Sequence, residues 1–272
     1  MNYFDSNIPI SVLQDYLHQN DWLLSKKEEI VSIEKPGEGN MNVVLRVTTN
    51  RRSFILKQSR TFVQKYQQIE APIDRIAVEW QFYQAIQSSA LIAHIPKVMG
   101  FDASDHLLLL EDLGQCEDMV FVYEKREIEK IALQKLIFII DLIHRTKVPD
   151  DFPKNIEMRK LNHQHIFVLP FLEDNGFSLD DIQPGLQELS LPYKRDANLK
   201  KAIKKIGKRY LSEGDTLLHG DYYPGSWIRT IDDIFIIEKP KGHEIKLERF
   251  SEPLFFEARS GKVTEKTEQL QE

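Results

Sequence analysis

Residues 217 to 227, LLHGDYYPGSW, place an acidic residue between an apolar run and a tight turn. A carboxylate in such a place can lie next to a substrate hydroxyl and take its proton, so Asp221 is the candidate catalytic base. We expect His219 to brace the loop by hydrogen bonding. An ordinary turn after a strand would account for the same residues, so the interpretation depends on the rest of the chain.

The composition excludes several classes of protein. The chain has 272 residues, enough for one large domain or two lobes. Its net charge of −6 provides no positive electrostatic field to attract nucleic acid or an anionic membrane, so neither partner is expected. The single cysteine, Cys116, cannot form an internal disulfide. There is no secretory signal and no apolar run near the ~20 residues of a membrane span, so we expect a soluble, cytoplasmic protein.

Strand patterns dominate the first part of the chain. Two β-rich runs lie on either side of the turn NRR within residues 30–59, and Lys57 comes near the end of the second run. Another strand, a turn and a further strand are expected within residues 94–114. We expect residues 1–112 to form a small, β-rich N-lobe.

Two helices accompany these strands. Residues 9–19 have helical spacing, and Ser11 could cap them. Residues 72–87 form the second helix, with Pro72 at its start and Glu79 beside its apolar stripe.

After residue 112 the sequence pattern changes from mainly strand-like to mainly helical. Long helices are expected at 127–146 and 196–212, so residues 113–237 read as a larger, mostly helical C-lobe that contains the HGD loop. The segment HQH at 163–165 looks like a strand, with one histidine packed and the other facing water. Residues 238–272 are expected to form a divergent and partly disordered tail.

Transfer of a γ-phosphoryl group needs a loop over the phosphates, a lysine, a base and metal ligands. Gly37 and Gly39 could let the backbone approach phosphates, although a plain hairpin is the better interpretation of a Gly-x-Gly turn taken alone. Lys57 could be an exposed lysine, but Glu79 could pair with it and hold it. Ser226 follows Asp221 by five residues, the spacing of a metal-holding residue. The glycine turn, the lysine, the helical glutamate and the HGD loop follow one another in the order that a phosphotransfer site needs. Coincidence is therefore the weaker explanation of this pattern.

Two rival chemistries have little support. The chain has no Gly-x-Ser-x-Gly stretch, and Ser226 has no evident base beside it, which argues against a serine hydrolase. Metal-dependent hydrolysis would need a denser set of ligands than HQH and HGD provide.

The segments GEGNMNVVLRV, FILKQ and HGDYYPGS resemble the aminoglycoside phosphotransferase and choline kinase family. The resemblance is greatest to its methylthioribose kinases, which also carry serine at the position of Ser226. It runs from about residue 28 to residue 237 and implies a two-lobed, protein-kinase-like α+β fold that uses ATP and Mg²⁺. The implied acceptor is a hydroxyl of a small molecule: a sugar such as methylthioribose, an aminoglycoside or an amino alcohol.

The resemblance also implies roles for individual residues. Lys57 would contact the ATP phosphates, Glu79 would brace it and Asp221 would be the catalytic base. Ser226 and Glu238 would hold magnesium. The remaining nucleotide contacts would come from the loop residues Gly37, Gly39 and Asn40 and from the connector residues Glu111 and Leu113.

Two features depart from the family pattern. Glu238 stands where relatives carry a magnesium-binding aspartate, and its extra methylene is poorly suited to octahedral geometry. Relatives also continue for several helices, whereas residues 258–272 hold only three apolar side chains, so the C-lobe is expected to be incomplete. These features leave two alternatives open: a catalytically impaired protein that binds nucleotide or a protein partner, and a truncated, marginally stable product. The sequence does not indicate an oligomeric state.

Overall fold

The computed structural model describes residues 2–36, 41–87, 89–212, 214 and 216–237, and the backbone of two short strands at 243–244 and 262–264. The expected phosphate-covering residues Gly37, Gly39 and Asn40, the expected metal ligand Glu238 and most of the 238–272 tail lie outside the described residues. Within the described part of the chain, no helix is long and apolar enough to cross a membrane.

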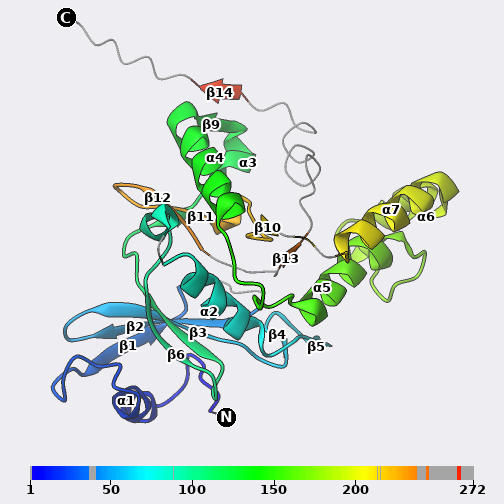
Figure 1. Ribbon diagram of the computed structural model, residues 1–272. Coiled ribbons are helices and arrows are strands. Elements are labelled where there is room, and N and C mark those ends of the chain that lie inside the picture. Colours follow the sequence, from blue (N-terminus) through cyan, green and yellow to red (C-terminus); the bar gives the residue numbers. More distant parts are fainter. Residues whose placement is uncertain are drawn as a thin grey trace, which may run out of the picture.

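An antiparallel sheet of five strands forms the centre of the N-lobe (Figure 1). Its strand order is β1-β2-β3-β7-β6. The strands are β1 (Ile30–Glu34), β2 (Val43–Thr49), β3 (Ser53–Gln58), β6 (Val98–Asp102) and β7 (Leu107–Glu111). The strands β2, β3, β6 and β7 confirm the two runs expected around the turn NRR and the two strands expected within residues 94–114, whereas β1 was not predicted.

Helices cover both faces of this sheet, which explains why the four leucines of β7 are all buried. Leu107 and Leu109 pack in one apolar cluster with α1 (Ile10–Gln19). Leu108 and Leu110 pack in a second cluster with α2 (Arg75–Ala85). The two sets alternate because successive side chains of a strand point to opposite faces.

The helix starts differ slightly from the expected ones. α1 begins directly after Pro9, whose φ is −58°, and no side chain caps it, so the expected Ser11 cap is wrong. Ser11 already lies in the first helical turn, one residue beyond the start. α2 begins at Arg75, three residues after Pro72. The hairpin of β4 (Phe62–Val63) and β5 (Tyr66–Glu70) connects β3 to α2.

The C-lobe is mainly helical. Its helices are α3 (Phe121–Lys125), α4 (Lys130–Arg145), α5 (Ile156–His163), α6 (Leu186–Arg195) and α7 (Ala197–Tyr210). α4 and α7 confirm the two long helices expected there. The apolar stripe of α4 is buried through Leu136, Ile139 and Ile143.

The strand expected around 163–165 is wrong. His163 ends α5, and the helix continues as a π-helical turn, Gln164–Val168. His163 packs on the ring of Phe167, four residues later, and on the ring of Tyr210 at the end of α7. A helix brings residues four apart to one face, so this packing favours a helical conformation over a strand. Three alternating residues are too short a run to establish a strand period.

Short strands flank the HGD loop. β11 (Trp227–Arg229) lies between β12 (Ile234–Ile236) and β8 (Glu117–Asp118). β10 (Thr216–Leu217) pairs with β13 (His243–Glu244), and β9 (Glu127–Glu129) pairs in parallel with β14 (Lys262–Thr264). The loop from residue 218 to residue 226 therefore connects two strands, as the sequence predicts.

Candidate active site

Lys57 and Glu79 form an ion pair between the sheet and α2. The Lys57 Nζ lies 2.6 and 2.5 Å from the two carboxylate oxygens of Glu79. Leu56 faces α1, so its neighbour Lys57 points to the other face of the sheet, toward α2. The side chains are only 12% and 3% exposed, which favours a fixed orientation of the ammonium group.

A third residue, Arg75, fastens α2 to the segment that follows residues 37–40. Its Nη2 donates to the Met41 carbonyl (2.7 Å) and its Nε to the Asn42 side chain (2.8 Å). Its Nη1 donates to the carbonyls of Arg60 (2.6 Å) and Pro72 (2.7 Å). Burial lowers the pKa of Arg75 to about 10. Sequence reasoning missed this residue; its position one helical turn before Glu79 was the available signal.

The loop that carries Asp221 is braced by His219, as expected. The Asp221 amide donates to Nδ1 of His219 (3.2 Å), so Nε2 carries the proton and donates to the Ile237 carbonyl (2.9 Å). Gly220 has a φ of +76°, a conformation that glycine adopts without strain. The Tyr222 hydroxyl donates to the Leu136 carbonyl at 2.6 Å and ties the loop to α4.

Ser226 lies at the end of the same loop, in the helical turn Pro224–Ser226. Its side chain is fully buried, and its Oγ makes no hydrogen bond with any other described residue. The Ile237 amide donates to the Ser226 carbonyl at 3.0 Å, so the chain after Ile237 starts beside this serine. A buried hydroxyl without a partner is costly and fits a ligand position.

The connector is fixed by Asp112, which sequence reasoning also missed. The Asp112 carboxylate pairs with Arg46 (2.9 Å) and accepts the Gly114 amide (3.0 Å). Burial would raise the pKa of Asp112, but hydrogen bonds from Ser53, Arg46 and Gly114 outweigh it and hold the pKa below its ordinary value.

The two expected adenine contacts lie at this connector. Glu111 ends β7, and both its amide and its carboxylate bond the backbone of Lys97. Leu113 is half-buried, and its amide makes no hydrogen bond with another described residue. The Leu113 N–H is therefore available to donate a hydrogen bond to a ligand, whereas the Glu111 N–H already donates to the Lys97 carbonyl.

A magnesium site can be tested against the donors present. Among the described residues, no group of three or more His, Cys, Asp or Glu side chains gathers to hold a metal. Mg²⁺ keeps several waters and needs only one or two protein carboxylates when phosphates complete its shell. The buried Ser226 hydroxyl, in one loop with Asp221, fits such a sparse site.

Comparisons with known proteins bear on the ancestry and the fold of the chain. No family model matches the chain. It is 24% identical over 219 residues to the methylthioribose kinase of Geobacillus kaustophilus (strain HTA426), a match that covers 74% of the chain and 54% of that relative. The chain therefore spans about half the length of this relative.

Two solved structures share the fold. LicA in complex with AMP gives a TM-score of 0.51 at 17% identity, covering 85% of this chain and 68% of LicA. Spectinomycin phosphotransferase APH(9)-Ia in complex with ADP and spectinomycin gives 0.50 at 13% identity, covering 88% and 71%. The chain is thus related in sequence to methylthioribose kinases, and it has the two-lobed, protein-kinase-like α+β fold of the aminoglycoside phosphotransferase and choline kinase family.

Proposed function

We propose that the chain transfers the γ-phosphoryl group of ATP to a hydroxyl group of a small molecule. The observation that carries this proposal is the Lys57–Glu79 pair, because a buried carboxylate fixes a strand lysine where phosphates can be bound. The relation to known small-molecule kinases supports it.

Each residue has a defined task in the proposed reaction. Lys57 binds the nucleotide phosphates, and Glu79 keeps its ammonium group in place. Asp221 orients the acceptor hydroxyl and takes its proton as the oxygen attacks. Gly37, Gly39 and Asn40 cover the phosphates, and the backbone near Glu111 and Leu113 receives the adenine.

Ser226 and Glu238 are the residues proposed to hold Mg²⁺. When bound, the ion neutralises charge on the phosphates during transfer. The proposed acceptor is a sugar such as methylthioribose, with aminoglycosides and amino alcohols as further classes. The lobe boundary at residue 112 and the cytoplasmic location also stay predictions.

A catalytically impaired, nucleotide-binding protein is the second candidate. The presence of Glu238 where related kinases are expected to have aspartate favours it. This candidate predicts nucleotide binding without transfer of phosphate.

Transfer of label from γ-labelled ATP to a panel of hydroxyl compounds tests the proposal. We expect transfer in the presence of Mg²⁺, and we expect Asp221→Asn to lower turnover by about 10²–10⁴-fold while ATP affinity changes little. The matched control is Asp232→Asn, which alters an exposed carboxylate in the next turn. Turnover that survives Asp221→Asn unchanged would refute the catalytic role, and binding without any transfer would favour the impaired protein.

A further inference from the structure

Arg75 is a buried arginine whose hydrogen bonds all go to uncharged oxygen atoms. It begins α2, and only 6% of the residue is exposed. All five N–H groups of its guanidinium are used. They donate over 2.6–3.5 Å to the side chain of Asn42 and to the carbonyls of Met41, Arg60, Phe62 and Pro72. Because none of these acceptors is a carboxylate, Arg75 acts mainly on the position of the chain around it.

Two of these acceptors lie in the segment that enters the sheet beside Lys57. Met41 and Asn42 directly follow the segment expected to cover the phosphates and directly precede β2. Val44, two residues after Asn42, lies opposite Lys57 in the β2–β3 ladder. Directly opposite residues of an antiparallel pair have Cα atoms only about 4.5–5.5 Å apart. Arg75 therefore holds the chain next to the lysine that is proposed to bind the phosphates.

The same guanidinium lies one helical turn before Glu79 on α2, and this placement adds a charge to the site. The Lys57 Nζ contacts the Glu79 carboxylate at 2.5 Å, and the same carboxylate attracts Arg75. Burial lowers the pKa of Arg75 to about 10, which leaves the group charged at neutral pH. Two cations thus share one carboxylate, so these three groups keep a net positive charge that suits the anionic phosphates of a nucleotide.

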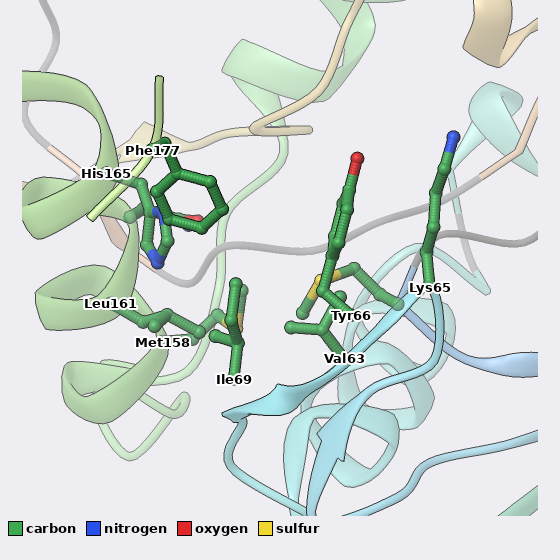
Figure 2. A pocket seen from close by; sticks show the side chains of 10 residues that line it. Val63, Lys65, Tyr66, Ile69, Met158, Leu161, His165 and Phe177 are labelled. Atoms are coloured by element: carbon green, nitrogen blue, oxygen red, sulfur yellow. The ribbon is translucent and has the colours of Figure 1, made fainter. Parts of the chain in front are cut away.

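Arg75 also holds the base of the β4–β5 hairpin, through the carbonyls of Arg60 and Phe62. This hairpin faces α5 across a pocket whose lining side chains include those of Val63, Tyr66, Met158 and Leu161 (Figure 2). Met41 lines the same pocket. The segment before β2, the hairpin and α2 are therefore joined through one planar group, and a change at Arg75 would let all three shift relative to Lys57.

We propose that Arg75 is a positioning residue for phosphate binding, which fixes the start of β2 relative to Lys57 without touching the nucleotide. This inference rests on the proposed phosphotransfer function and adds to it a residue that acts through its neighbours. Lysine cannot replace Arg75, because an ammonium group carries its three N–H groups on one atom and cannot serve acceptors on several sides at once. A shift of about 1 Å in a positioning group can reduce a rate by about 10²-fold, so the loss of these bonds should be measurable.

Calorimetric titration of ATP with Mg²⁺, and of adenosine, into the full chain tests this role. Arg75→Lys keeps the charge but loses most of the five bonds, so ATP should bind about tenfold more weakly, while adenosine, which has no phosphates, should bind as before. The matched control is Arg159→Lys, because Arg159 is 4% exposed and its Nη2 donates to the carbonyls of Tyr210 and Ser212 in the C-lobe. The control should change neither affinity, and a purely structural role for Arg75 would give the same result as the control.

A second variant keeps the test decisive if Arg75→Lys fails to fold. Asn42→Ala removes one acceptor and leaves Arg75 in place, and it should weaken ATP binding about threefold with adenosine unchanged. If ATP binding depends on Lys57 but ignores both variants, or if ATP and adenosine weaken together, the positioning role is overturned and the nucleotide site stands. If the wild type binds no ATP, or Lys57→Met binds it equally well, the proposed function fails and the positioning role fails with it.

Discussion

At the scale of single residues, Lys57 and Glu79 show how a buried ion pair is maintained. Taking both charges out of water is costly, and the close contact between Nζ and the two carboxylate oxygens offsets that cost. Removing one partner takes from the other its closest opposite charge, although Arg75 still attracts Glu79. Such a pair is a weak source of stability but a strong determinant of where the lysine points.

A double-mutant cycle tests this view of the pair. Glu79→Leu is expected to lower the free energy of unfolding by about 3–5 kcal/mol, and Lys57→Met combined with Glu79→Leu should regain most of it. Urea unfolding of the wild type, the two single mutants and the double mutant gives the coupling free energy between Lys57 and Glu79. The same cycle on the exposed pair Lys160–Glu157 should yield less than about 1 kcal/mol. Losses at Lys57 and Glu79 that simply add would contradict the expected coupling.

Glu28 is a second buried carboxylate, and its effect should depend on pH. Burial would raise its pKa, but hydrogen bonds from the Leu24 amide, Arg52 and Thr49 outweigh burial and hold the pKa below its ordinary value. A lowered folded-state pKa stabilises the protein above the unfolded-state value, and this contribution is lost as the pH falls through the folded-state pKa.

We therefore expect Glu28→Gln to lower the free energy of unfolding by about 2 kcal/mol at pH 7 and by much less near pH 3. Urea unfolding at several pH values measures the difference, with the exposed neighbour Glu29→Gln as control. A deficit that stays constant down to low pH would show that the charge of Glu28 is not what stabilises the fold.

At the scale of elements, the contact between α7 and the end of α5 depends on a glycine. A Cβ on Gly207 would lie 2.7 Å from Nε2 of His163 and 3.2 Å from Cβ of Phe167. The helices approach closely because Gly207 has no side chain, although glycine is a poor helix former.

Gly207→Ala should therefore lower the melting temperature, with a loss of about 1–3 kcal/mol in the free energy of unfolding. This loss is expected even though alanine favours helices over glycine by about 1 kcal/mol. Lys208→Ala, at an exposed neighbouring position of α7, is the control and should change it little. A stabilised Gly207→Ala protein would show that His163 moves aside at little cost.

The same elements show what could be predicted from the sequence. The alternation in β2 and the long stripe of α4 each span enough residues to define a period, so both were predicted correctly. The pairing of Lys57 with Glu79 followed from a lysine on a strand and a glutamate on the next helix. The five hydrogen bonds of Arg75 to backbone carbonyls and Asn42 could not be foreseen, because they depend on tertiary folding that no sequence period encodes.

At the scale of the whole molecule, the two lobes share an apolar core. One cluster contains Phe82 and Leu110 from the N-lobe together with Ile139, Leu217 and Trp227 from the C-lobe. A second cluster, in the N-lobe, contains α1 and shares the strand β7 with the first. The lobes are therefore expected to unfold together.

Tryptophan fluorescence can follow each region separately. In a variant that keeps only Trp22 and another that keeps only Trp227, the urea midpoint by fluorescence should equal the midpoint by far-ultraviolet circular dichroism of the same variant. Each variant is its own control, since both signals come from one sample. Midpoints that differ by more than about 0.5 M urea would mean that the lobes unfold independently.

The most direct test of nucleotide binding is a calorimetric titration of ATP, with and without Mg²⁺, into the wild type and Lys57→Met. We predict that Mg²⁺ strengthens binding to the wild type and that Lys57→Met weakens it at least about tenfold, because the phosphates lose their charge-assisted contact. Lys204→Met, an exposed lysine replaced in the same way, should bind like the wild type. Equal affinity in the wild type and Lys57→Met, with no effect of Mg²⁺, would contradict a kinase site at this pair.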